Sequence, residues 1–238
     1  MTKLFEMVFN VPMECDGCEQ SVKNALQDTK GLEKLNIDWK SNVVSVIGFV
    51  PPSEIVSSLQ KIGKDAIIRG TGAPNSAAVS ILECFHSFKK NQSVKGLARI
   101  VAVDQENLVV DLTLSNLAEG TYYPQIRASG DLSEDGLSSS KIFHSFEPFV
   151  VSGQNAASSG STLGDSHQQF LQARLRIMDI IGRSFVLSKD KEDVTEDSLC
   201  GVIARSAGAW ENDKYVCTCS GKTIWQERVD ALGKGITS

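Results

Sequence analysis

Residues 13–18 have the sequence Met-Glu-Cys-Asp-Gly-Cys, which places Cys15 and Cys18 three positions apart, just after a short apolar run. Thiolate sulfur is a soft donor that selects Cu(I), zinc or iron–sulfur clusters over hard cations. Two thiolates on one exposed loop favour Cu(I), because a four-coordinate zinc or iron–sulfur site would need two further ligands. The same spacing also describes a redox dithiol or a structural pair. The motif therefore predicts a Cu(I) site, with a redox or structural pair as the alternatives.

The residues around this motif predict a small α+β domain over residues 1–70. Alternating apolar side chains and turn signals predict four strands, over residues 3–11, 32–39, 43–50 and 65–68. Helical spacing predicts one helix over residues 19–30, capped by Gly31, and a second helix that starts at the N-cap Ser53. The order β-α-β-β-α-β is that of a ferredoxin-like sandwich.

Beyond residue 70 the sequence pattern changes. Residues 71–76 (TGAPNS) have the composition of a linker, and residues 77–208 predict an all-β domain of the Greek-key barrel type. Its predicted strands are apolar, β-branched runs between polar turns, over residues 77–85, 96–103, 108–114, 122–127, 142–151, 181–187 and 201–204. The Ser/Gly-rich residues 152–166 predict a mobile loop.

Residues 209–238 are too few for an independent core. They contain the sequence Cys217-Thr-Cys219 and a short amphipathic piece with Trp225, Val229 and Leu232 at helical spacing. We expect a flexible tail, or one that becomes ordered only on a partner. Because a disulfide between two cysteines this close would be strained, the pair predicts Cu(I) ligation or thiol–disulfide exchange with a target protein.

Composition limits the class of protein. The chain of 238 residues is long enough for two domains and a small third piece. Its formal net charge of -5, without a dense Lys/Arg run, argues against nucleic acid or an anionic membrane as partner. We find no signal-peptide pattern and no apolar stretch of membrane-spanning length, so we expect a cytosolic protein. In that compartment the 6 cysteines are expected to be metal ligands or working thiols.

A series of landmarks runs in order along the chain. They are Met13-x-Cys15-x-x-Cys18 after a strand, Gly63-Lys64, Gly130-Asp131, IIGRSFV at 180–186, CGVI at 200–203, RSAG at 205–208, WEN at 210–212, Cys217-x-Cys219 and Ile224-Trp225. On these landmarks the whole chain resembles the copper chaperones for copper–zinc superoxide dismutase, of the fungal type. The first domain resembles a heavy-metal-associated domain, and the middle domain resembles superoxide dismutase itself.

The resemblance implies roles for the cysteine pairs and their neighbours. Cys15 and Cys18 would bind one Cu(I) as thiolates, and Met13 would pack beneath the site. Lys64 would offset the negative charge of the bis-thiolate copper centre, or else be an ordinary solvated lysine. The tail pair would complete copper delivery to the dismutase and the oxidation of its internal disulfide.

The resemblance also implies partners. The surface with which the dismutase forms its own dimer resembles residues 201–208 and Trp210 of this chain. The candidate interface residues are Gly201, Ile203, Arg205 and Trp210. The alternative is that they simply pack against the end of the barrel. Such a surface would serve a heterodimer with copper–zinc superoxide dismutase or a homodimer. A membrane copper transporter would be the copper source, and the family adds a mitochondrial intermembrane-space fraction to the cytoplasmic location.

The middle domain departs from the enzyme at its metal ligands. A copper–zinc dismutase needs a cluster of imidazoles, but Gln125, Arg127 and Ser188 occupy the aligned histidine positions. We therefore expect no zinc site, no copper in the barrel and no dismutase activity. Cys200 matches half of the enzyme's disulfide without a partner in residues 152–166, so we expect a buried thiol. A general copper buffer or thiol–disulfide relay is the main alternative function; a catalytic dismutase is disfavoured by the missing ligands.

Overall fold

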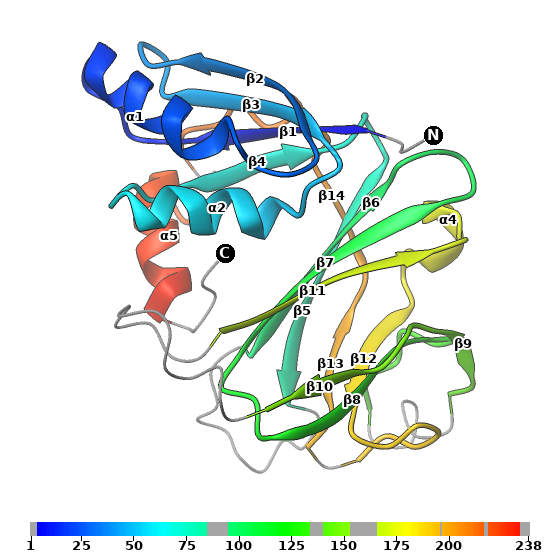
Figure 1. Ribbon diagram of the computed structural model, residues 1–238. Helices are drawn as coiled ribbons and strands as arrows, with labels where there is room; N and C mark the ends of the chain where they lie inside the picture. The colour runs from blue at the N-terminus through cyan, green and yellow to red at the C-terminus, as the bar shows by residue number, and fades with distance from the viewer. Residues whose placement is uncertain are drawn as a thin grey trace.

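The computed structural model describes residues 4–84, 95–133, 140–152, 166–195, 197–216 and 219–233. It contains a four-stranded sheet followed by a larger curled sheet, and the two lie against each other (Figure 1). The predicted fold class, a βαββαβ domain followed by an all-β domain, is confirmed.

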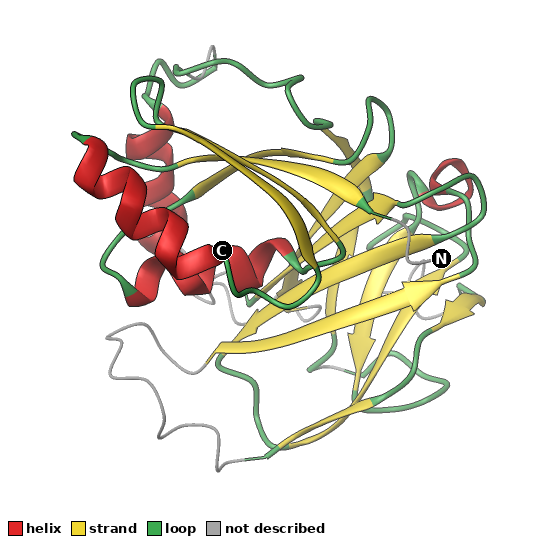
Figure 2. Cartoon of the chain, turned by 45° about the horizontal axis from the view of Figure 1, so that its top comes forward, coloured by secondary structure: helices red, strands yellow, loops and turns green. Residues whose placement is uncertain are grey.

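The first domain has the predicted order of elements. These are β1 (Phe5–Asn10), α1 (Asp16–Leu26), β2 (Leu32–Asp38), β3 (Val43–Gly48), α2 (Pro52–Lys61) and β4 (Ile67–Thr71). The antiparallel strands have the order β2-β3-β1-β4, which leaves β4 at one edge. Both helices cover the same face of this sheet (Figure 2). Met7 and Phe9 from β1 are fully buried against Val22, Leu26 and Leu59 from the helices.

The first helix begins and ends earlier than predicted. It starts directly after Cys15, and it ends at Leu26. Gly31 therefore does not cap it and instead adopts a φ of 88° in the turn before β2. There, a β-carbon would lie 2.6 Å from the backbone oxygen of Phe49, so both the left-handed conformation and the close approach require glycine.

The second helix is capped from the other domain. Pro51, not Ser53, occupies the N-cap position and makes no side-chain cap hydrogen bond. Ser53 lies inside the helix, where its backbone N–H and its hydroxyl donate to the two carboxylate oxygens of Asp111, at 2.8 and 2.6 Å. A carboxylate is favourable at a helix N-terminus, because it satisfies free N–H groups and complements the helix dipole. This cap comes from β7 of the second domain, so no local sequence pattern reveals it.

The second domain is a curled antiparallel sheet. Its strands are β5 (Ala77–Cys84), β6 (Gly96–Ala102), β7 (Leu108–Ser115), β8 (Gly120–Arg127), β9 (Ile142–Ser145), β10 (Phe149–Val151), β11 (Ser166–Ala173), β12 (Ser184–Ser188), β13 (Leu199–Val202) and β14 (Ala204–Ser206). The main order is β10-β8-β12-β13-β5-β6-β7-β11. The rings of Phe149 and His167 stack at 4.9 Å, which brings the two end strands together.

Three features of this domain differ from the prediction. Residues 142–151 form two strands, because the chain leaves the sheet near Pro148, which lacks a backbone N–H. Residues 166–173 form the full strand β11, which their polar sequence SHQQFLQA concealed. The strand predicted over residues 181–187 begins only at Ser184, as β12, and the short helix α4 (Ile177–Ile180) precedes it. Of the predicted mobile loop over residues 152–166, residues 153–165 lie outside the described residues.

Three polar side chains that the sequence analysis aligned with the histidine positions of a dismutase are buried. Gln125, Arg127 and Ser188 are 1%, 3% and 0% exposed. Their side chains donate to backbone carbonyls of one loop, those of Lys191, Glu192 and Asp193, at 2.6, 2.7 and 2.8 Å. We call these three side chains the polar clamp. It ties the loop after β12 to the sheet by hydrogen bonds alone.

The two domains share apolar surface. All eight residues of β7 are buried, because one face of the strand lies in the core of the curled sheet and the other faces the first domain. Val101 and Val109 belong to the core cluster of the first domain, and the rings of Phe49 and Phe170 meet edge to face at 5.3 Å. The Ser53–Asp111 contact lies within this interface.

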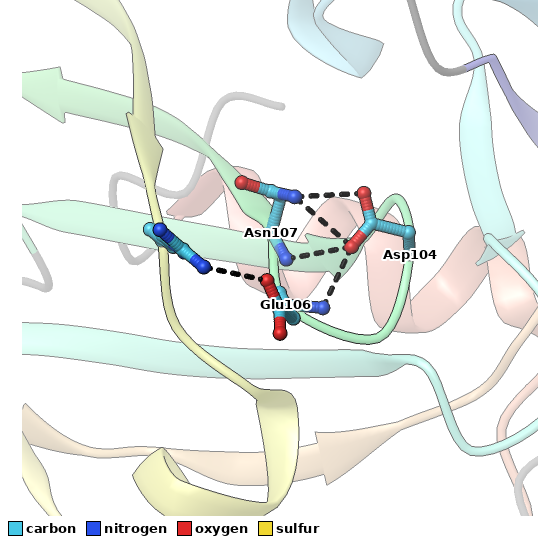
Figure 3. A network of polar contacts seen from close by, with 4 residues as sticks. Asp104, Glu106 and Asn107 are labelled. Atoms are coloured by element: carbon cyan, nitrogen blue, oxygen red, sulfur yellow. Dashed lines mark hydrogen bonds and ion pairs between the residues drawn. The ribbon is translucent and has the colours of Figure 1, made fainter.

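The turn between β6 and β7 is fixed by Asp104 (Figure 3). Its carboxylate accepts hydrogen bonds from the backbone N–H of Glu106 and Asn107, at 2.6 and 2.9 Å, and from the Asn107 side chain. Arg174, which follows β11, donates to the carboxylate of Glu106 at 2.9 Å. This Asx-type turn sets the register of the strand that carries Asp111.

The C-terminal segment, described at residues 209–216 and 219–233, contacts the first domain. It includes an isolated bridge between Val216 and Thr223 and the helix α5 (Ile224–Gly233). This helix contains Trp225, Val229 and Leu232, which the sequence analysis placed at helical spacing in a short amphipathic piece. Its buried residue is Arg228, whereas Val229 is 67% exposed. The predicted flexibility of the tail stays a prediction.

Candidate metal centre

Cys15 and Cys18 lie where β1 passes into α1. Cys15 is the N-cap of α1 and is exposed, and Cys18 lies in the first turn and is partly exposed. The two sulfur atoms are 3.9 Å apart, with the Cys15 thiol directed at the sulfur of Cys18. The apolar side chains of β1 fix the start of the loop, and the helix fixes its end. The structure therefore brings together the two cysteines that the motif predicted.

The surroundings of Cys18 favour its thiolate form. A hydrogen bond from the backbone of Glu14 is the largest cause that lowers the pKa of Cys18, and partial burial opposes it. The side chains of Cys15 and Lys64 and the backbone of Cys15 lower this pKa further. Because the thiolate is the form that binds a metal, the loop is prepared for a soft cation.

The sulfur separation suits a bent two-coordinate metal. With metal–sulfur bonds of about 2.3 Å, as in zinc thiolates, sulfurs 3.9 Å apart subtend an angle of about 116° at the metal. A linear arrangement with the same bonds would need a separation of about 4.6 Å. The pair can therefore hold a metal and leave one side of it open to a third ligand.

Three neighbouring residues hold the loop in place. Met13 is 4% exposed and lies in the core of the first domain, where we expected it to pack. Its backbone N–H donates to the side-chain oxygen of Asn42 at 2.7 Å. The Lys64 ammonium donates to the backbone oxygen of Pro12 at 3.0 Å, which places its charge beside the loop.

Asn42 is a site residue that the sequence analysis missed. It adopts a φ of 57° in the turn between β2 and β3, a conformation in which asparagine is common, and its backbone oxygen also accepts the N–H of Val11 at 2.9 Å. The strands predicted over residues 32–39 and 43–50 imply a turn at this point, but the contact of Asn42 with Met13 spans 29 positions of sequence.

Among the other predicted residues, Cys219 is exposed, whereas Cys217 lies outside the described residues. Some residues of the predicted partner surface are buried in the structure, and others are exposed. Ile203 is 1% exposed, and Gly201 is buried with its backbone against Ile81, so neither offers a side chain to a partner. Arg205 is exposed.

Trp210 is 56% exposed, but its indole N–H donates to Glu6 of the first domain at 2.8 Å. In the described part of the chain, no group of three or more His, Cys, Asp or Glu side chains could hold a metal ion together. Within the same residues, no helix has the length and apolar character needed to cross a membrane.

Comparisons with known proteins agree with this geometry. Residues 8–65 match the model of the heavy-metal-associated domain family. The chain is 55% identical to the superoxide dismutase 1 copper chaperone of Debaryomyces hansenii, over 100% of both chains. It is 42% identical to the protein of the same name from Saccharomyces cerevisiae, covering 98% of this chain and 97% of that one.

A solved structure, the apo form of the HMA domain of a copper chaperone for superoxide dismutase, covers 29% of this chain and 71% of that chain at 27% identity, with a TM-score of 0.28. The full-length identities decide the assignment. The chain belongs to the family of copper chaperones for superoxide dismutase.

Proposed function

We propose that this chain is a copper metallochaperone that binds Cu(I) at Cys15 and Cys18, docks on immature copper–zinc superoxide dismutase and delivers the ion to it. The observation that carries the proposal is the exposed dithiol, with its sulfurs 3.9 Å apart and the pKa of Cys18 lowered. The names of the relatives support the cargo and the recipient. The polar clamp supports a second domain that carries no metal and has no dismutase activity.

The open side of the site supports transfer by ligand exchange. A thiolate of the recipient binds the copper as a third ligand, and one of the two chaperone sulfurs then leaves. The incoming thiol loses a proton and the released thiolate gains one, so charge and protons balance without a free ion. The ammonium of Lys64 lies beside the loop and would offset the negative charge of a Cu(I) held by two thiolates. Its attraction would grow as the third thiolate adds its charge.

The tail would complete the maturation of the target. Oxidation of two target thiols to a disulfide releases two electrons and two protons. A Cys217–Cys219 pair in its disulfide form takes them up through a mixed disulfide and returns as a dithiol. A strained disulfide is easily reduced, so the close spacing makes such a pair a strong oxidant.

The second domain would supply the docking surface. We propose a heterodimer with the dismutase, in which the exposed side chains Val202, Arg205 and Trp210 take part; a homodimer would use the same face. We also propose a membrane copper transporter as the source of Cu(I), and a cytoplasmic location with a fraction in the mitochondrial intermembrane space. The last two proposals rest on the family relationship.

The test uses copper-free, disulfide-reduced dismutase mixed with the Cu(I)-loaded chain, in oxygen and with a copper chelator in excess. Dismutase activity is compared for the wild type, Cys15→Ser/Cys18→Ser and Cys217→Ser/Cys219→Ser, with Cys84→Ser as the matched cysteine control. We expect activation by the wild type and the control, and by neither double variant.

Two results would count against the proposal. Tight Cu(I) binding without any activation would leave a copper buffer. Activation that survives in the Cys15→Ser/Cys18→Ser variant would place the delivered ion elsewhere in the chain.

A further inference from the structure

The edge of the first domain carries the C-terminal segment. Arg69 of the edge strand β4 is 8% exposed, and its Nε donates to the backbone oxygen of Asn212 at 2.7 Å. Its guanidinium carbon lies 4.9 Å from the ring centroid of Tyr215. A buried guanidinium that combines a hydrogen bond with a cation–π contact forms a specific anchor.

A second anchor lies on α5. Arg228 is 8% exposed and donates from Nε and Nη2 to the two carboxylate oxygens of Asp65, at 3.1 and 3.0 Å. This fork-to-fork geometry is the strong form of an ion pair. Arg228 is the one buried side chain of α5 in the described part of the helix, so the position of α5 depends on this contact more than on apolar packing. In Figure 1, α5 is drawn next to α2, the helix that ends shortly before Asp65.

The two anchors flank the tail cysteine. Val216 and Thr223 form a bridge, and the backbone N–H of Ile224 donates to the oxygen of Tyr215 at 3.0 Å. Val216 and Thr223 therefore lie side by side, and Cys219 is exposed. Arg69 holds the chain just before this bridge, at Asn212 and Tyr215, and Asp65 holds the helix that follows it.

The same edge contacts the copper loop. Asp65 directly follows Lys64, whose ammonium holds the backbone oxygen of Pro12, just before Met13 and the cysteine motif. A change in the position of Asp65 therefore moves the residue that charges and braces the metal loop.

We infer that the first domain is a docking surface for the chain's own C-terminal segment, built on Asp65 and Arg69, and that docking and Cu(I) binding at Cys15 and Cys18 strengthen each other through Lys64. Coupling of two equilibria is reciprocal, so the docked segment tightens the copper site by the same factor as copper tightens docking. The inference goes beyond delivery to the dismutase, because it concerns the chain before any target is present.

Hydrogen–deuterium exchange on the full copper-free chain tests the docking. The variants are Asp65→Asn, Arg228→Gln and the charge exchange Asp65→Arg/Arg228→Asp. Lys222→Gln is the matched control, because its ion pair with Asp230 stays within the segment. We expect exchange of the α5 amides to rise by about tenfold or more in both single variants, since exchange follows the local opening equilibrium. At the docking edge, exchange of the β4 amides should also rise in both single variants and stay at the wild-type rate in the control. The charge exchange should restore protection.

Chelator competition for Cu(I) tests the coupling, in a Cys217→Ser/Cys219→Ser background where the first domain is the site measured. We expect Arg228→Gln to weaken Cu(I) binding by about fivefold, the low end of typical coupling between protein sites, and Lys222→Gln to leave it unchanged. Unchanged α5 exchange in both single variants, or no restoration by the charge exchange, overturns the docking surface. Faster exchange with unchanged Cu(I) affinity overturns the coupling. Neither measurement uses the dismutase, so either can fail while the delivery assay succeeds.

Discussion

The contact between Ser53 and Asp111 joins the two domains. The burial of Asp111 predicts how much stability the chain loses when the Ser53 hydroxyl is removed. Ser53→Ala removes the hydroxyl that donates to the Asp111 carboxylate at 2.6 Å but leaves the backbone N–H bond at 2.8 Å. Asp111 is 2% exposed, so water cannot replace the lost donor. Burial raises the pKa of Asp111, while Arg99 and Ser53 lower it; removing the hydroxyl shifts this pKa further upward.

The chain offers a matched control on the same helix. Ser57 accepts a hydrogen bond from Gln168 of β11 at 3.1 Å, also across the domain interface but at an exposed position. A hydrogen bond to a buried charged group contributes about 2 kcal/mol, whereas a surface change of this kind stays within about 0.5 kcal/mol. With an m-value of about 2–3 kcal/mol/M in urea, Ser53→Ala should lower the midpoint by about 0.7–1 M.

Urea unfolding, followed by circular dichroism and tryptophan fluorescence, measures both variants on the full chain. We expect a clear loss for Ser53→Ala and a small one for Ser57→Ala. Equal midpoint shifts would refute the reasoning, because they would mean that the buried carboxylate does not depend on its hydroxyl donor. An unchanged midpoint for Ser53→Ala would refute the trans-domain cap itself.

Three further predictions follow from other contacts. Burial, with smaller contributions from neighbouring groups, raises the pKa of Cys200 to about 12. At pH 8, alkylation of Cys200 should therefore be about a thousandfold slower than that of a thiol with the ordinary cysteine pKa. Mass spectrometry of the folded chain after alkylation would measure this difference. Asn42→Gly keeps the left-handed turn but removes the acceptor for the Met13 N–H. Loss of a hydrogen bond of about 1 kcal/mol should lower the Cu(I) affinity about fivefold, whereas Asn42→Asp should retain it. An unchanged affinity of Asn42→Gly in chelator competition would contradict this prediction. Arg127→Met leaves two carbonyls without their donor and should cost about 3 kcal/mol in urea unfolding, whereas Arg176→Met, at an exposed ion pair, should cost less than about 1 kcal/mol.

The sequence predicted the parts of the fold that depend on local patterns. Alternation and helical spacing placed the βαββαβ elements, because each element buries one face against the next. The strand at residues 166–173 escaped because SHQQFLQA alternates weakly, and its pairing with β7 decides its conformation.

Contacts between distant segments could not be predicted in the same way. The cap of α2 by Asp111 spans 58 positions, and the pairing of Asp65 with Arg228 spans 163. The second contact also explains why α5 buries Arg228 while the apolar Val229 is exposed. For the metal centre, the motif located both candidate ligands, but the brace from Asn42 depends on a turn that only the fold brings close to the loop.

The polar clamp of Gln125, Arg127 and Ser188 has a consequence for a protein that carries a metal ion that it would not have for an enzyme. A barrel with histidines at these positions would offer a second place for the ion to bind. In the function that we propose, the amide, guanidinium and hydroxyl groups of the clamp would remove this competition. Because they fix the loop by hydrogen bonds within the chain, we expect the proposed docking surface to form before copper binds.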